Sequence, residues 1–140
     1  MSKIKIKTLD MSVAIWGYAT TEFEVLKKEL EKSGKYRKDL LYRGFEAINI
    51  KKLLKTGRDS YYKDEEFDDG DFIFCSTESE ILSLCDEDAF KYARLCDNPA
   101  IAVFDGDYFD NVMPYTYRYK ECDDRAKALV AVYKLKYPYD

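Results

Sequence analysis

The stretch Ala100-Ile101-Ala102-Val103-Phe104 is an uninterrupted apolar run with turn-forming residues on both sides. Asn98-Pro99 precedes it, and Asp105-Gly106-Asp107 follows it. A short apolar run between such residues is typical of a buried strand. We therefore predict a core strand over 100–104, and the segments on either side of it indicate the fold class.

Three helices are predicted before this strand. Thr21 and Glu24 form a capping-box pattern ahead of an apolar stripe that Gly34 ends. Asn49 can cap a second helix, which Gly57 ends. The third helix is indicated by four residues at helical spacing, Ala89, Tyr92, Ala93 and Cys96.

The remaining apolar or alternating segments predict strands, and most of them lie late in the chain. Helices that come early and strands that cluster late favour an α+β fold over a regular parallel one. The predicted strands besides 100–104 are 3–7, 40–42, 72–75, 115–119 and 128–135.

Composition narrows the function classes. A chain of 140 residues is expected to form one domain over 1–140, and an aromatic content of 16% excludes bulk disorder. The chain contains no histidine, which excludes histidine-based acid–base catalysis, Ser-His or Cys-His nucleophiles and histidine metal sites. Any catalysis has to use carboxylates, hydroxyls, arginine, lysine or tyrosine.

The charge distribution and the cysteine spacing bear on possible binding partners and on the cellular compartment. Residues 1–63 carry a net charge of +7 and residues 64–140 a net charge of −11, so the basic half offers weak support for contact with nucleic acid. A solvated surface of mixed sign is the competing interpretation. Without an export signal or an apolar run approaching 18 residues, we expect a cytoplasmic protein with no membrane contact. The cysteines suit no metal motif and are expected to be reduced and free: Cys75, Cys85, Cys96 and Cys122.

Arg43 is the first candidate for ligand binding. It lies in Leu41-Tyr42-Arg43-Gly44, at the end of a predicted strand. A guanidinium fixed by a strand can bind a phosphate in bidentate fashion, and a following glycine lets a ligand approach the backbone. An ordinary surface or salt-bridge role is the competing interpretation.

Two hydroxyls and a group of carboxylates are the other candidates. Ser76 and Thr77 directly follow the predicted strand over 72–75. The competing interpretation is that Thr77 forms a capping box with Glu80 at the start of a helix. Late in the chain, a carboxylate could stabilise a cationic transition state at the mouth of a cleft, or merely belong to a polar turn. These carboxylates are Glu121, Asp123 and Asp124.

No metal site is expected. Asp105, Asp107 and Asp110 are close in sequence, but they lack the twelve-residue EF-hand pattern and its terminal glutamate.

Taken in order, several motifs resemble the Arg-Ser-Glu class of mono-ADP-ribosyltransferases. The family has an arginine at the end of an early strand, then a Phe-x-Ser-Thr-Ser motif, a helix with Ala-x-x-Tyr-Ala, a hydrophobic strand and a late Glu-x-Glu pair. The matching segments are Leu41-Tyr42-Arg43-Gly44, Phe74-Cys75-Ser76-Thr77-Glu78, Ala89-Phe90-Lys91-Tyr92-Ala93, Ala100-Ile101-Ala102-Val103-Phe104 and Glu121-Cys122-Asp123.

This resemblance implies a split core of two small β-sheets with N-terminal helices, and NAD as the substrate. Arg43, Ser76 and Glu121 would be the catalytic residues, with Asp123 as the alternative carboxylate. The residues implied to bind NAD are Tyr42, Arg43, Gly44, Thr77 and Tyr92. The residues expected to be buried in the core are Leu41, Ile73, Ile101, Val103, Leu129, Val130 and Val132.

Two functions remain open on this basis, and a third, a carboxylate-based hydrolase or a nucleic-acid protein of another fold, is supported only by the basic first half of the chain. The resemblance implies an enzyme that cleaves the bond between nicotinamide and ribose, as a transferase to an unidentified macromolecular acceptor or as a glycohydrolase. Glu78 in place of the third hydroxyl and Asp123 in place of the second glutamate favour the alternative, an inactive protein of the same fold that binds or inhibits a partner. Tyr61, Tyr62 or Phe90 could stack on nicotinamide.

Overall fold

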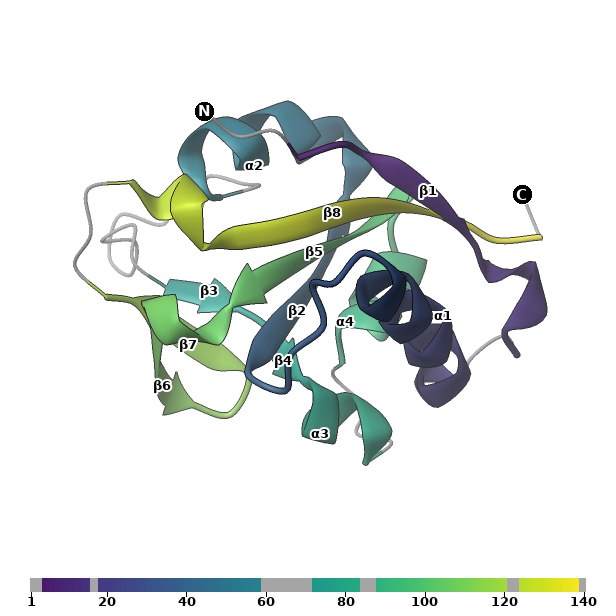
Figure 1. Cartoon of the computed structure of the whole chain (residues 1–140), viewed down its shortest axis with the longest axis horizontal. Helices are drawn as coiled ribbons and strands as arrows, with labels where there is room; N and C mark the ends of the chain where they lie inside the picture. The colour runs from purple at the N-terminus through teal and green to yellow at the C-terminus, as the bar shows by residue number, and fades with distance from the viewer. Residues whose placement is uncertain (1–3, 16–17, 59–71, 84–87, 121–123, 139–140) are drawn as a thin grey trace.

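The computed structural model describes residues 4–15, 18–58, 72–83, 88–120 and 124–138. It contains two β-sheets with helices packed around them, which confirms the α+β class (Figure 1). None of the helices in these segments is long and apolar enough to span a membrane.

The larger sheet has five strands in the order β1-β8-β5-β2-β4. The predicted strand over 100–104 is its central strand, β5, and extends from Pro99 to Asp105. β1 runs parallel to β8, and the other neighbours are antiparallel. The other four strands are β1 Lys7–Asp10, β2 Leu40–Glu46, β4 Ser76–Thr77 and β8 Leu129–Lys136.

The smaller sheet is antiparallel and has the order β3-β7-β6. Its strands are β3 Phe72–Phe74, β7 Thr116–Tyr119 and β6 Phe109–Met113. The helices are α1 Ala19–Lys32, α2 Ile50–Thr56, α3 Glu78–Leu82 and α4 Ala89–Arg94. Short 3₁₀ turns span Met11–Val13, Ala47–Asn49, Gly106–Tyr108 and Arg125–Ala128.

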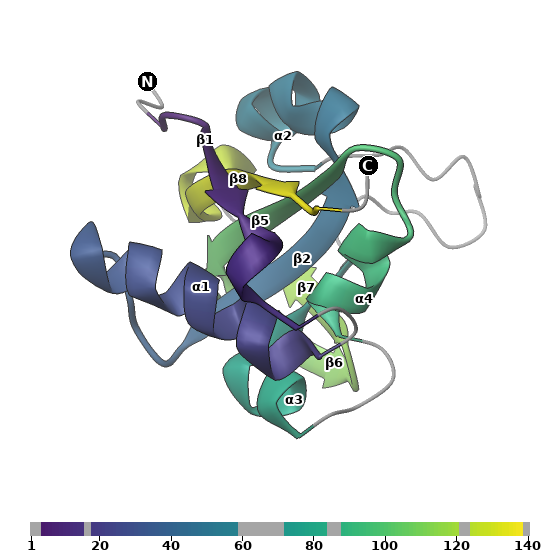
Figure 2. The ribbon, with the colours of Figure 1, turned by 90° about the vertical axis from the view of Figure 1, so that its right-hand side faces the viewer.

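Two apolar clusters cover the two faces of the larger sheet. One packs α1 and α4 against one face, and the other packs α2 and the smaller sheet against the opposite face (Figure 2). Alternation along β2 divides its residues between them, so that Leu41 and Phe45 face the smaller sheet and Tyr42 faces α1.

The predicted core is correct except at Val130. Six of the seven residues are buried, but Val130 is half-buried. The register between β5 and β8 shifts at this point, since Val103 pairs with Ala131 while Phe104 pairs with Leu129. Val130 is therefore the extra residue of a β-bulge, which turns its side chain away from the regular alternation.

The start of the chain differs from the prediction. The first described strand is Lys7–Asp10 rather than 3–7. Helix α1 begins two residues before Thr21, and its N-cap is Tyr18. The Thr21 hydroxyl donates to the Tyr18 carbonyl at 2.8 Å and accepts from the Ile15 N–H at 3.0 Å. It therefore joins α1 to the preceding loop and makes no capping box.

The other helix signals have mixed outcomes. Thr77 and Glu80 form the predicted capping box at the start of α3. Gly34 and Gly57 follow α1 and α2 with φ values of +74° and +79°, as C-terminal glycines do. Asn49 stands at the N-cap of α2 but makes no side-chain capping bond.

Tyr42 leads to a prediction about stability. Its side chain is fully buried against Phe23, and among the described residues its hydroxyl has no hydrogen-bond partner. An unpaired buried hydroxyl costs stability, so Tyr42→Phe should raise the free energy of unfolding by about 1 kcal/mol. Urea denaturation measures this change, and a loss of stability in the variant would contradict it.

Candidate functional site

The segment from Phe72 to Thr77 passes from one sheet to the other. Phe72–Phe74 belongs to the smaller sheet, and Ser76–Thr77 pairs with β2 in the larger sheet. Cys75 lies between them and donates its backbone N–H to the carbonyl of Tyr115 at 3.0 Å. The two sheets therefore diverge at Cys75, and a pocket opens beside it.

Arg43 reaches this pocket from β2. It follows Tyr42 in the strand and so points to the opposite face, toward the smaller sheet. Its Nη1 donates to the carbonyl oxygen of Phe74 at 3.0 Å. The half-buried guanidinium thus bridges β2 and β3 at the point where the sheets separate.

Gly44 brings helix α4 into direct contact with β2. A Cβ at this position would lie 2.0 Å from the carbonyl oxygen of Ala89 and 2.6 Å from the nitrogen of Ala93. Both are backbone atoms, so only glycine permits this approach. On the other side of the same contact, the buried Ser76 hydroxyl accepts the Ala89 N–H at 3.0 Å. Ser76 therefore fixes the first turn of α4.

The pocket has a volume of about 170 Å³, and its lining, so far as the structure describes it, has one charged side chain with aromatic rings around it. The Phe74 and Tyr92 side chains are about half exposed at its rim. A drug-sized ligand needs about 300 Å³ or more, so the pocket can enclose one ring-sized part of a ligand. Its lining residues are Arg43, Gly44, Phe74, Cys75, Ser76, Ala89, Tyr92 and Tyr115.

Four of the predicted site residues meet in this pocket. Arg43 and Gly44 come from β2, Ser76 from β4 and Tyr92 from α4. They are brought together across 49 residues of sequence.

Two other predicted residues do not line the pocket. Tyr42 is on the opposite face of β2, in the core beneath α1. The Thr77 hydroxyl accepts the N–H of Glu80 at 3.1 Å and caps α3.

The late carboxylates are only partly described. Glu121 and Asp123 lie outside the described residues. Asp124 accepts the N–H of Ala126 at 3.0 Å and caps a 3₁₀ turn. Within the described lining of the pocket there is no carboxylate.

Sequence reasoning missed Phe74 and Tyr115 as pocket residues. Phe74 was expected inside a buried strand, yet it ends β3 with about half its side chain exposed. Tyr115 has φ +62°, a conformation that non-glycine residues rarely adopt. No local pattern predicts that conformation. Of the three rings considered for stacking on nicotinamide, Phe90 is fully buried and does not line the pocket, and Tyr61 and Tyr62 lie outside the described residues.

Two buried phenols lie in β7 behind the pocket. Burial raises the pKa of Tyr117 to about 12, and burial also raises the pKa of Tyr119 although the nearby Arg125 and Arg43 oppose that shift. Both phenols therefore stay neutral near pH 7. They supply no negative charge to the pocket, and among the described lining residues Arg43 carries the charge.

Three acidic side chains meet elsewhere, at the end of β5. Carboxylate oxygens of Asp39, Asp105 and Asp107 lie within 4.8 Å of one another. Arg37 bridges the first two, with Nη2 at 2.6 Å from Asp105 and Nε at 3.0 Å from Asp39. The cluster is a salt-bridged group, and Asp110, which was considered with it, belongs to β6.

Cys75 and Cys96 are reduced cysteines that form no disulfide within the described residues. Cys85 and Cys122 lie outside the described residues.

Comparison with known proteins gives no match. No protein-family model, no curated protein and no solved structure is significantly similar to the chain. The function is therefore inferred from the pocket and its residues.

Proposed function

We propose that this chain is an ADP-ribosyltransferase-like protein that binds NAD in the Arg43 pocket and cleaves the bond between nicotinamide and ribose. The observation that carries the proposal is the convergence of Arg43, Gly44, Ser76 and Tyr92 on one pocket where two sheets diverge. The sequence motifs had singled out these four residues without any information on their distances in space.

The pocket supports the binding half of the proposal. A guanidinium has five N–H donors, so Arg43 can hold the Phe74 carbonyl and a phosphate of NAD at the same time. The rings of Tyr92 and Phe74 offer flat apolar faces at the rim, and nicotinamide is a ring that fits a pocket of about 170 Å³.

Ser76 has a positioning role in this proposal. Its hydroxyl accepts the N–H of Ala89, so it holds the wall of the pocket that carries Tyr92. Gly44 makes the same wall possible, because it lets α4 approach β2.

The cleavage half of the proposal needs a carboxylate. When the bond between C1′ of the ribose and the nicotinamide nitrogen breaks, its electron pair leaves with nicotinamide and positive charge develops on the ribose. A carboxylate that accepts a hydrogen bond from the ribose 2′-hydroxyl stabilises that charge. A nucleophile of the acceptor, or water, then adds to C1′ and loses a proton. Glu121 is the proposed carboxylate, with Asp123 as the alternative.

A second candidate function is binding without cleavage. Among the described residues that line the pocket, none is a carboxylate. Glu78, which stands where the family has its third hydroxyl, accepts a hydrogen bond from Tyr36 instead of lining the pocket. Both facts favour a protein that holds NAD or a related nucleotide and acts through a partner protein.

Arg43→Lys tests the proposal. We expect NAD binding, measured by calorimetry, to weaken about 10- to 100-fold, because lysine cannot make the bidentate contact to phosphate. Arg118→Lys is the matched control, since Arg118 is an exposed residue of β7 that does not line the pocket.

Three outcomes separate the candidates. NAD binding that depends on Arg43, together with release of nicotinamide, supports the enzyme. Binding with the same dependence but without release supports the second candidate. A wild-type protein that neither binds NAD nor releases nicotinamide contradicts the enzyme and favours the alternative of an inactive protein that binds or inhibits a partner.

A further inference from the structure

Glu22 is a buried carboxylate on the opposite side of α4 from the pocket. It lies in α1, and its side chain is 0% exposed. An ionised carboxylate without partners is very costly in such a place, so its contacts have to compensate for the lost water. Burial raises the pKa of Glu22, and hydrogen bonds from Tyr137 and Arg94 oppose that rise.

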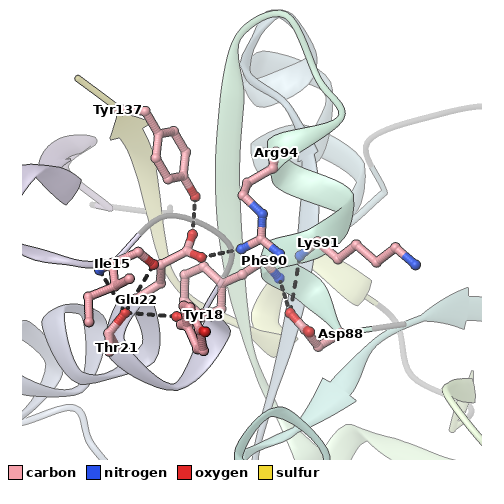
Figure 3. A network of polar contacts seen from close by, with 9 residues as sticks. All are labelled: Ile15, Tyr18, Thr21, Glu22, Asp88, Phe90, Lys91, Arg94 and Tyr137. Carbon is pink, nitrogen blue, oxygen red and sulfur yellow. Dashed lines mark hydrogen bonds and ion pairs between the residues drawn. The ribbon is translucent and has the colours of Figure 1, made fainter. Parts of the chain in front are cut away.

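The two partners of Glu22 come from distant parts of the chain. One carboxylate oxygen accepts from Nη1 of Arg94 in α4, and the other accepts from the hydroxyl of Tyr137, which follows β8 (Figure 3). The Tyr137 side chain is buried, and that of Arg94 is 14% exposed. Glu22 therefore links α1, α4 and the segment after β8 at one point.

Helix α4 depends on such contacts for its position. It has six residues, and an isolated helix of that length does not persist in water. At its first turn, Asp88 accepts the N–H groups of Phe90 and Lys91 at 2.8 and 3.1 Å (Figure 3). At its last residue, Arg94 is held by Glu22.

Between these two anchors, α4 forms one wall of the pocket. Ala89 and Tyr92 line it, and Ala89 and Ala93 lie against Gly44. A rotation or shift of α4 would carry the Tyr92 ring with it. The Glu22–Arg94 contact is thus placed to fix the orientation of Tyr92, which lies two residues before Arg94 in the same helix.

We infer that Glu22 is a positioning residue for the pocket: through Arg94, with Tyr137 holding its second oxygen, it fixes α4 and thereby the Tyr92 ring in the pocket that Arg43 also lines. The inference rests on the proposed function for its ligand, NAD. Beyond the proposed function, it identifies residues outside the pocket, Glu22, Arg94 and Tyr137, that determine the shape of the pocket.

A purely structural role for Glu22 makes a different prediction. In that case its loss would lower global stability, and the pocket would be unchanged in every molecule that stays folded. A positioning role requires α4 to loosen within the folded protein, before the sheets open.

Glu22→Gln distinguishes the two roles, because it keeps the shape of the side chain and removes the charge that Arg94 contacts. For each amide, NMR gives the factor by which hydrogen exchange is faster in the variant than in wild type. We expect this factor to be about ten times larger at Ala93 in α4 than at Ile101 in β5. NAD affinity of the folded protein should also fall about tenfold. Tyr137→Phe removes the hydrogen bond to the second oxygen of Glu22 and keeps the charge, so it should give a smaller change of the same kind.

Leu53→Ala is the matched control. Leu53 is a fully buried residue of α2 in the other apolar cluster, so its loss should speed exchange at Ala93 and Ile101 in parallel and leave NAD affinity unchanged. Parallel acceleration in Glu22→Gln, with unchanged affinity, would overturn the inference. If wild-type protein does not bind NAD, the proposed function fails, and the exchange rates still decide whether Glu22 holds α4.

Discussion

Gly44→Ala is expected to lower the free energy of unfolding by about 3 kcal/mol. The new Cβ would lie 2.0 Å from the Ala89 carbonyl oxygen and 2.6 Å from the Ala93 nitrogen. Both neighbours are backbone atoms, so no side chain can turn aside and α4 has to move away from β2. Urea denaturation with an unchanged m-value would measure the loss as a lower midpoint.

Gly34→Ala is the control for this variant. Gly34 has φ +74°, but no atom lies within 4 Å of the position that a Cβ would occupy. Alanine there meets only the backbone cost of a left-handed conformation, about 1 to 2 kcal/mol. Gly44 itself has no positive φ, so a loss at Gly44 no larger than that at Gly34 would contradict a cost set by the contact with α4.

On the proposed reaction, Glu121→Gln should reduce the rate of nicotinamide release by two to three orders of magnitude, a scale of about 10²- to 10³-fold for one lost transition-state contact. Glutamine keeps the length of the side chain and removes the charge that would stabilise the ribosyl cation. NAD affinity should stay nearly unchanged, because the charge develops only in the transition state. The measurement is single-turnover release of nicotinamide alongside calorimetric binding of NAD.

Two neighbouring variants complete this experiment. Asp123→Asn should leave the rate unchanged if Glu121 is the carboxylate, and the opposite pattern would reassign the role to Asp123. Asp124→Asn is the control, because Asp124 caps the N–H of Ala126 and asparagine can accept the same bond. A full rate in both Glu121→Gln and Asp123→Asn would contradict cleavage by either carboxylate.

The features that were predicted correctly are local ones. The 100–104 strand, the Thr77–Glu80 capping box and the glycines after α1 and α2 are each encoded within a few residues. In these places the hydrophobic pattern, the side-chain cap and the backbone conformation all favour the same structure.

The features that were missed depend on distant partners. β4 has two residues, and it exists because Ser76 pairs with Tyr42 across 34 residues of chain. Because of that pairing, the chain passes from one sheet to the other at Cys75. No sequence pattern within 72–77 predicts this change of sheet. α1 likewise starts before its apparent cap, since Thr21 bonds to the loop at Ile15.

The candidate site was predictable only in part, because some of its features are local in sequence and others depend on distant partners. Arg43 and Ser76 were identified from residue type and from their positions at strand ends, and both reach the pocket. The family resemblance implied that Tyr42 binds the ligand beside Arg43, yet neighbours in a strand point to opposite faces. The position of the smaller sheet determines whether Tyr42 or Arg43 points toward the pocket.

The lengths of the outermost strands have a consequence for self-association. The larger sheet ends in β4, with two residues, and β1, with four, and strands this short offer little backbone for a second chain to pair with. The longest outermost strand described is β6, with five residues, in the smaller sheet. A register shift between Asn111 and Met113 interrupts it, and such irregularities oppose the addition of a further strand. Fibrils that grow by joining these edges are therefore disfavoured by the fold itself.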